Sequence, residues 1–167
     1  MVRFVGALKD YANEIARAER KPTSPRRPSR KFKLIAFTDG ASRGNPGKAA
    51  CAAILLDEKN EELLRRSKGL GVTTNNVAEY EGVLLALDLA RTLGASDVDV
   101  RLDSELVVRQ LNGDYKVKHP ALKPLFERTR EAVTDFDRVT FSHVPRDENK
   151  EADGLANDEL DGRGQDP

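Results

Sequence analysis

Apolar residues along this chain follow two patterns, one typical of strands and one typical of helices. Short apolar or alternating runs predict strands at residues 33–38, 49–56, 62–70, 97–102 and 138–144. Apolar positions three or four residues apart predict helices over 2–18, 77–94, 104–113, 119–133 and 149–159. Three strands come first and the later strands alternate with helices, so the order predicts an α/β fold with a mixed sheet flanked by helices.

The chain divides by composition into a main domain and two ends. Residues 2–18 carry an apolar stripe at helical spacing, and residues 21–30 contain three prolines, which cannot continue that helix. We therefore expect a helix and linker at 1–30, one domain at 31–158 and a flexible tail at 159–167. The first helix would pack on its own domain or on a copy of itself.

Charge is balanced over the whole chain but not along it. Lys plus Arg and Asp plus Glu number 28 each, whereas residues 1–33 hold ten basic side chains and three acidic ones. A basic segment next to an acidic domain suits a polyanion partner for the segment and cation sites in the domain. The arginines of residues 21–30 fit a nucleic-acid arm and a solvated linker equally well.

The single cysteine and the hydropathy of the chain indicate where in the cell the protein is expected. Cys51 lies in a small apolar run, so disulfide stapling is excluded and its thiol is expected to be buried and inert. No window approaches a membrane span, and the N-terminus lacks the pattern of a secretory signal. We expect a cytoplasmic protein without membrane contact, and a monomer.

Four carboxylates stand at predicted element ends. Asp39 follows the strand at 33–38 and Asp103 follows the strand at 97–102, so neighbouring parallel strands would bring both acids to one edge. Glu79 and Asp153 lie in the first turns of two helices. Taken singly, each has a plain explanation: a turn residue, a helix cap, or a favourable contact with a helix dipole.

Taken together, four acids at one edge need a counter-charge. Converging carboxylates raise one another's pKa values unless cations neutralise them. Oxygen ligands without a histidine or cysteine cluster favour Mg²⁺, with Mn²⁺ as the other candidate. Two such ions would support displacement at a phosphodiester.

Four ordered motifs carry a family resemblance. They are TDGASRGNPG at 38–47, TTNNVAEYEG at 73–82, LDSELVVRQLNG at 102–113 and VPRDENKEADGLAN at 144–157. Together they resemble type 1 ribonuclease H over residues 31 to about 157. The resemblance implies a five-stranded mixed sheet of order 3-2-1-4-5 with strand 2 antiparallel. It also implies two-metal cleavage of the RNA strand of RNA–DNA hybrids, leaving 5′-phosphate and 3′-hydroxyl ends. The metal-binding and catalytic residues would be Asp39, Glu79, Asp103 and Asp153.

Polar residues around the acids suit a hybrid substrate. A hybrid differs from DNA by its 2′-hydroxyls, which short amides and backbone groups can read across a wide minor groove. The expected substrate contacts are Gly40, Ser42, Asn45, Thr74, Asn75, Asn76 and Arg146. Of these, Thr74 and Asn75 resemble the family's pocket for a DNA-strand phosphate, and one residue of 74–76 should also cap the helix.

The chain departs from the family pattern in two places. The loop before Asp153 is short and has Arg146 near the position of the mobile histidine found in many relatives. His143 is a tempting substitute, but it lies in a predicted strand, and His119 beside Pro120 suits a surface turn. The second place is residues 110–123, where some relatives insert a basic helix that grips the hybrid and this chain has only Lys116, Lys118 and Lys123. Glu105 also stands where the family often has a glutamine that contacts the substrate.

Two alternatives to a hybrid-specific enzyme remain open. One is a nuclease of the same fold that acts on double-stranded RNA or branched nucleic acid. The other is a non-catalytic nucleic-acid binding module, which would be expected to lack at least one of the four acids. All four are present.

Overall fold

The computed structural model describes residues 31–163, so the helix and linker predicted at 1–30 lie outside the described residues. Its five strands form one sheet in the order β3-β2-β1-β4-β5. The strands are β1 (Lys33–Gly44), β2 (Gly47–Leu56), β3 (Glu62–Thr73), β4 (Asp97–Leu102) and β5 (Arg138–His143). β2 runs antiparallel to both of its neighbours, and β1, β4 and β5 are parallel. The expected order and the antiparallel second strand are confirmed.

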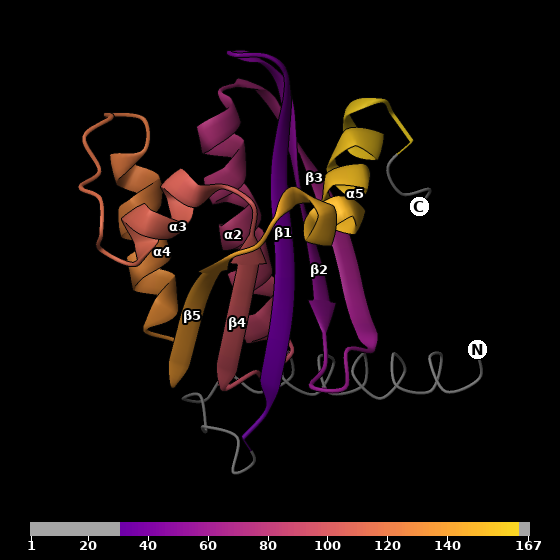
Figure 1. Cartoon of the computed structure of the whole chain (residues 1–167), viewed down its shortest axis with the longest axis vertical. Helices are drawn as coiled ribbons and strands as arrows, with labels where there is room; N and C mark the ends of the chain where they lie inside the picture. The colour runs from indigo at the N-terminus through magenta and orange to yellow at the C-terminus, as the bar shows by residue number, and fades with distance from the viewer. Residues whose placement is uncertain (1–30, 164–167) are drawn as a thin grey trace, which may run out of the picture.

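Helices cover both faces of this sheet (Figure 1). On one face lies α2 (Asn75–Thr92), against which α4 (Lys123–Val133) packs, with α3 (Glu105–Leu111) above the end of β4. On the other face lies α5 (Lys150–Leu160), which packs on β1, β2 and β3 and follows the short 3₁₀ helix η1 (Arg146–Asn149). No helix among residues 31–163 is long and apolar enough to cross a membrane.

β1 is longer than its sequence pattern predicts, and this corrects the position of Asp39. The acid was expected at a strand end, but β1 continues to Gly44 because β2 pairs with it from Ile35 to Gly44. The parallel pairing with β4 stops earlier, at Phe37 and Arg101. Asp39 therefore lies inside β1, at the point where only one neighbouring strand remains.

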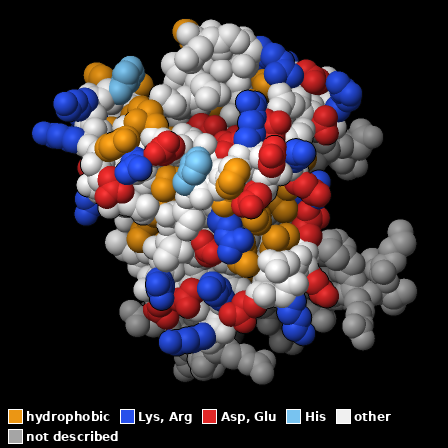
Figure 2. Space-filling view, viewed as in Figure 1, with side chains coloured by type: hydrophobic (Ala, Val, Ile, Leu, Met, Phe, Trp, Pro, Cys, Tyr) orange, Lys and Arg blue, Asp and Glu red, His pale blue; other side chains and the backbone are white. Residues whose placement is uncertain are grey.

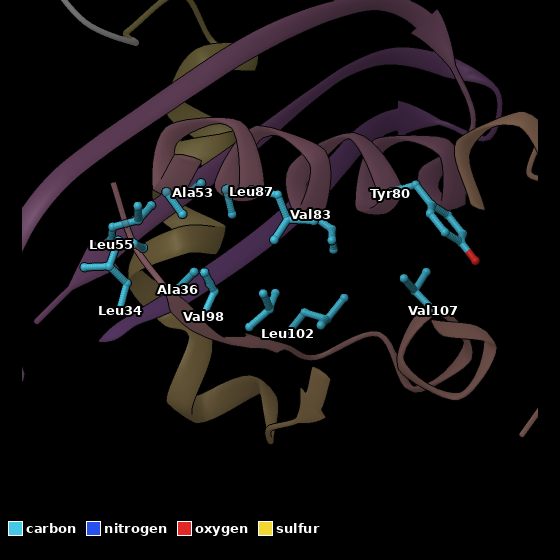
Figure 3. Packing of buried hydrophobic residues seen from close by; sticks show 14 of the residues in the cluster. Leu34, Ala36, Ala53, Leu55, Tyr80, Val83, Leu87, Val98, Leu102 and Val107 are labelled. Atoms are coloured by element: carbon cyan, nitrogen blue, oxygen red, sulfur yellow. The ribbon is translucent and has the colours of Figure 1, made fainter. Parts of the chain in front are cut away.

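The core between α2 and the sheet is built from aliphatic side chains (Figure 3). From the strands come Leu34, Ala36, Leu55, Val98 and Leu102, and from α2 come Val83 and Leu87, all at most 2% exposed. Burying this apolar surface, at about 25 cal/mol for each Å², supplies most of the stability of the layer. The rigid layer fixes α2 over the strands that carry Asp39 and Asp103.

Two glycines let α2 lie unusually close to β1. A Cβ at Gly40 would stand 2.3 Å from the backbone carbon of Ala78, and a Cβ at Gly82 would stand 3.0 Å from the backbone oxygen of Asp39. Either contact is tighter than ordinary van der Waals packing allows. The close approach brings Glu79, one residue after Ala78, beside β1.

The last helix extends beyond the domain boundary expected at residue 158. α5 runs to Leu160, which is 5% exposed, and Lys48 donates a hydrogen bond to the Leu160 carbonyl at 3.2 Å. Arg43 also donates to Asp161 at 3.1 Å. The end of α5 is therefore attached to the long hairpin of β1 and β2.

Candidate active site

Three carboxylates from three separate elements meet at one edge of the sheet. Asp39 comes from β1, Glu79 from α2, and Asp103 directly follows β4. One carboxylate oxygen from each lies within 4.8 Å of those of the other two. Asp39 and Glu79 are each 4% exposed, so little water solvates their charges.

The surroundings of Asp39 and Glu79 disfavour the ionised carboxylates. Burial, followed by the charges of Asp103 and Asp153, raises the pKa of Asp39 from 3.8 to about 8. Burial, followed by the charges of Asp39 and Asp103, raises the pKa of Glu79 well above its ordinary value. A cation would reverse this repulsion, because it stabilises the charged form of every acid around it.

The donor set fits a hard divalent cation. All three groups offer carboxylate oxygens, which are the ligands preferred by Mg²⁺ and Mn²⁺. Within residues 31–163, the buried Oε2 of Glu79 has no hydrogen-bond partner. A buried carboxylate oxygen without a partner is unfavourable, and a bound cation would satisfy it.

Asp153 lies beside this group rather than inside it. It projects from the first turn of α5 and reaches Asp39, whose pKa it raises through a side-chain hydrogen bond and through its charge. The oxygens that lie within 4.8 Å of one another come from the other three acids only. The four acids thus lie together, as a compact triad and a fourth acid next to Asp39.

The start of α2 and the β1–β2 turn hold several expected substrate contacts in one place. The side chain of Thr74 accepts a hydrogen bond from the Val77 N–H at 3.3 Å, so Thr74 is the residue that caps the helix. Asn45 Oδ1 accepts from the Asn75 N–H at 3.0 Å, which ties the turn to the helix. Asn75 is exposed and Asn76 is half-buried.

The other expected contacts differ in how accessible they are. Gly40 was expected to let a substrate approach the backbone; it is buried, and its missing side chain makes room for α2. Ser42 is half-buried on β1, opposite Ala49 of β2. Arg146 is exposed in η1.

Both histidines are exposed, and both are visible on the face shown in Figure 2. His143 ends the edge strand β5 opposite Leu102, the residue before Asp103. His119 Nδ1 accepts a hydrogen bond from the Ala121 N–H at 3.1 Å, as expected for a turn residue. Glu105 is paired with Arg109 at 2.9 Å, so its charge is balanced locally.

Sequence reasoning missed one residue behind the site. Asn149 is 1% exposed, and its Nδ2 donates to the carbonyl of Thr38 at 2.9 Å. This bond joins the start of α5 to the strand residue that precedes Asp39. The only available signal was the position of Asn149 just before a helix, which says nothing about a partner 111 residues away in the sequence.

The strand order and the cluster of carboxylates from β1, α2 and the end of β4 define a ribonuclease H-like protein. The family model described as reverse transcriptase-like matches residues 37–159. A bifunctional protein of Mycobacterium tuberculosis is 43% identical over 135 residues, which are 80% of this chain and 37% of that protein. Ribonuclease HI of Halobacterium salinarum is 41% identical over 134 residues, which are 80% of this chain and 67% of that protein.

A solved structure gives the same result. The crystal structure of LC11-RNase H1 in complex with RNA/DNA hybrid matches with a TM-score of 0.74 and 42% identity, over 77% of this chain and 97% of that one. The chain belongs to the ribonuclease H family. It spans little more than a third of the length of the mycobacterial relative.

Proposed function

We propose that this chain is an endoribonuclease that hydrolyses the RNA strand of RNA–DNA hybrids. The observation that carries the proposal is the convergence of Asp39, Glu79 and Asp103, two of them buried, with oxygens within 4.8 Å. Such a cluster is unfavourable without a cation. The hybrid held by the related LC11-RNase H1 supports this choice of substrate.

In this proposal the four acids hold two Mg²⁺ ions, with Mn²⁺ as a possible replacement. When bound, such ions activate water and stabilise the leaving oxygen of a phosphodiester, which leaves 5′-phosphate and 3′-hydroxyl ends. Asp39 and Glu79 would be rigid ligands, because β1 and α2 are packed too closely to shift. Asp153, on the opposite layer, would complete the site next to Asp39.

The substrate would be read beside the acids by the start of α2. Asn75 and Asn45 are exposed next to each other, and their amides suit 2′-hydroxyl and phosphate oxygens. Thr74 and Asn75 would hold a phosphate of the DNA strand. Asn76, Ser42 and the exposed Arg146 would contribute further contacts, Arg146 through its charge.

One assay separates this proposal from its alternatives. Labelled hybrid, double-stranded RNA and single-stranded RNA are incubated with the protein, with Mg²⁺, with Mn²⁺ and with chelator alone. We expect metal-dependent cleavage of the hybrid only. Preferential cleavage of double-stranded RNA would indicate the other nuclease, and hybrid binding without cleavage would indicate a binding module.

The variant Asp103→Asn tests the site itself. We expect it to remain folded and to lose cleavage, because the amide removes one ligand charge from the triad. Exposed Asp114 provides a matched control, and Asp114→Asn should cleave normally. Full Mg²⁺-dependent cleavage by Asp103→Asn would refute the assignment.

A further inference from the structure

Arg43 connects the β1–β2 hairpin to the last helix. Its Nη1 donates to Asn157 Oδ1 at 2.8 Å, and its Nη2 donates to Asp161 Oδ1 at 3.1 Å. The two acceptors lie four residues apart, so one guanidinium spans a full turn of α5 and its end. The planar fork of arginine suits such a two-point contact better than lysine does.

The contact with Arg43 fixes which way the Asn157 amide points. A guanidinium has only donors, so the amide oxygen must face Arg43 and the amide nitrogen must face the other way. On that side, Asn157 Nδ2 donates to the Asp153 carboxylate Oδ1 at 3.2 Å and to the Asp153 carbonyl at 2.8 Å. Arg43 therefore acts on Asp153 through Asn157.

Asp153 is the one member of the four acids that comes from α5. Asp39, Glu79 and Asp103 come from the tightly packed layer of β1, α2 and β4, whereas Asp153 stands on the opposite face. Like Asp103 it is half-buried, and it lies next to the carboxylate of Asp39. Because the Asp153 side chain is partly open to solvent, other rotamers are available to it. The hydrogen bond from Asn157 Nδ2 to Asp153 Oδ1 at 3.2 Å favours the rotamer that reaches Asp39.

We propose that Arg43 and Asn157 form a positioning pair that holds the Asp153 carboxylate in place for a divalent cation. The inference rests on the proposed function, because it takes Asp153 as a metal ligand. The hydrogen bonds of Arg43 and Asn157 go to α5 and to each other, and none goes to Asp39, Glu79 or Asp103. Partners that orient a ligating group commonly change metal affinity by about 10- to 100-fold when they are removed.

Metal binding without substrate tests the pair directly. Isothermal titration calorimetry with Mn²⁺ and with Mg²⁺ would compare the full chain with Asn157→Ala, Arg43→Ala and the double variant. We expect about tenfold weaker binding for Asn157→Ala and a smaller loss for Arg43→Ala. The double variant should bind no more weakly than Asn157→Ala, because Arg43 acts only through Asn157.

Lys48→Ala is the matched control. Lys48 lies on the same hairpin, carries the same charge and donates to the Leu160 carbonyl of the same helix at 3.2 Å, without contacting Asp153 or Asn157. Its removal should leave metal affinity unchanged while loosening the end of α5. Arg43→Lys should restore part of the affinity lost in Arg43→Ala. Thermal unfolding of each variant in chelator establishes that it is folded.

Two results would overturn the inference. One is unchanged metal affinity in folded Asn157→Ala. The other is an equal loss in Arg43→Ala and Lys48→Ala, which would mean that the positive charge of the hairpin matters and the hydrogen bond does not. A wild-type chain that binds metal but does not cleave hybrid would contradict the proposed function alone, and the affinity comparison would still stand.

Discussion

Replacing one buried acid should make the metal-free protein more stable. In Asp39→Asn the side chain keeps its shape but loses the charge that Asp103 and Asp153 oppose. At pH 7 the wild-type carboxyl must bind a proton to be tolerated in the fold, since its pKa is about 8 there and 3.8 ordinarily. The amide needs no proton, so the free energy of unfolding should rise.

The magnitude follows from the pKa difference. Protonating a group with an ordinary pKa of 3.8 at pH 7 costs about 1.4 kcal/mol for each pH unit, which is about 4 kcal/mol over that interval. Asparagine also replaces one acceptor oxygen beside Glu79 with an amide nitrogen, at a cost of about 1–2 kcal/mol. The net stabilisation expected for Asp39→Asn is therefore about 2–3 kcal/mol.

Urea unfolding followed by circular dichroism at pH 7 in chelator would measure the difference. The exposed acid Asp114 gives the control, because Asp114→Asn changes net charge equally and should leave the unfolding free energy within about 0.5 kcal/mol of wild type. Mg²⁺ should stabilise wild type more than Asp39→Asn. An unchanged or lower unfolding free energy for metal-free Asp39→Asn would refute the idea that repulsion dominates this site.

Four further outcomes are expected. Because folding raises the pKa of Asp39, protonation of this carboxyl favours the folded state. Its contribution to the free energy of unfolding is complete below pH 3.8 and is lost as pH rises to about 8. In chelator, the free energy of unfolding should thus fall as pH rises, with Asp39 contributing at most about 1.4 kcal/mol per pH unit, and Asp39→Asn should have a shallower slope. Gly40→Ala should destabilise the fold by about 3 kcal/mol in urea, since its Cβ would lie 2.3 Å from the backbone of α2, and normal stability would contradict that packing. Tyr80→Phe should cost about 1–2 kcal/mol in the same assay because it leaves buried Gln110 without the 2.7 Å bond from the Tyr80 hydroxyl, and no loss would mean that the bond is dispensable. Removing residues 1–30 should flatten the salt dependence of hybrid binding if that segment contacts phosphates, and an unchanged slope would exclude such contacts.

Local patterns were sufficient to predict the strands and helices of residues 31–163, whereas the sheet order came from the family resemblance. The alternating run at residues 97–102 and the apolar runs around Leu34 and Leu55 coincide with β4, β1 and β2. Strand ends were harder, because the extension of β1 to Gly44 depends on its pairing with β2. The end of β1 contains polar residues such as Ser42 that follow no hydrophobic periodicity, so the sequence pattern could not assign them to the strand.

The acids were found from the sequence, but their supports were not. Each acid could be recognised by its position next to a predicted strand or helix, and the four ordered motifs indicated that the acids belong to one site. The partners of Asn149 and Arg43 lie 111 and 114 residues away in the sequence, across two layers of the fold. A signal for Asn157 did exist, since it follows Asp153 by four residues and so shares its side of α5.

The reactivity of the buried cysteine can be used to measure local opening of the sheet. Cys51 is the only thiol in the sequence, is fully buried in the middle of β2, and has its pKa raised to about 12, chiefly by burial. A thiol reagent can therefore react only when the sheet opens, so the labelling rate counts openings without any introduced probe. Comparing that rate with and without Mg²⁺ would show whether an ion bound by the acids reduces local opening around Cys51.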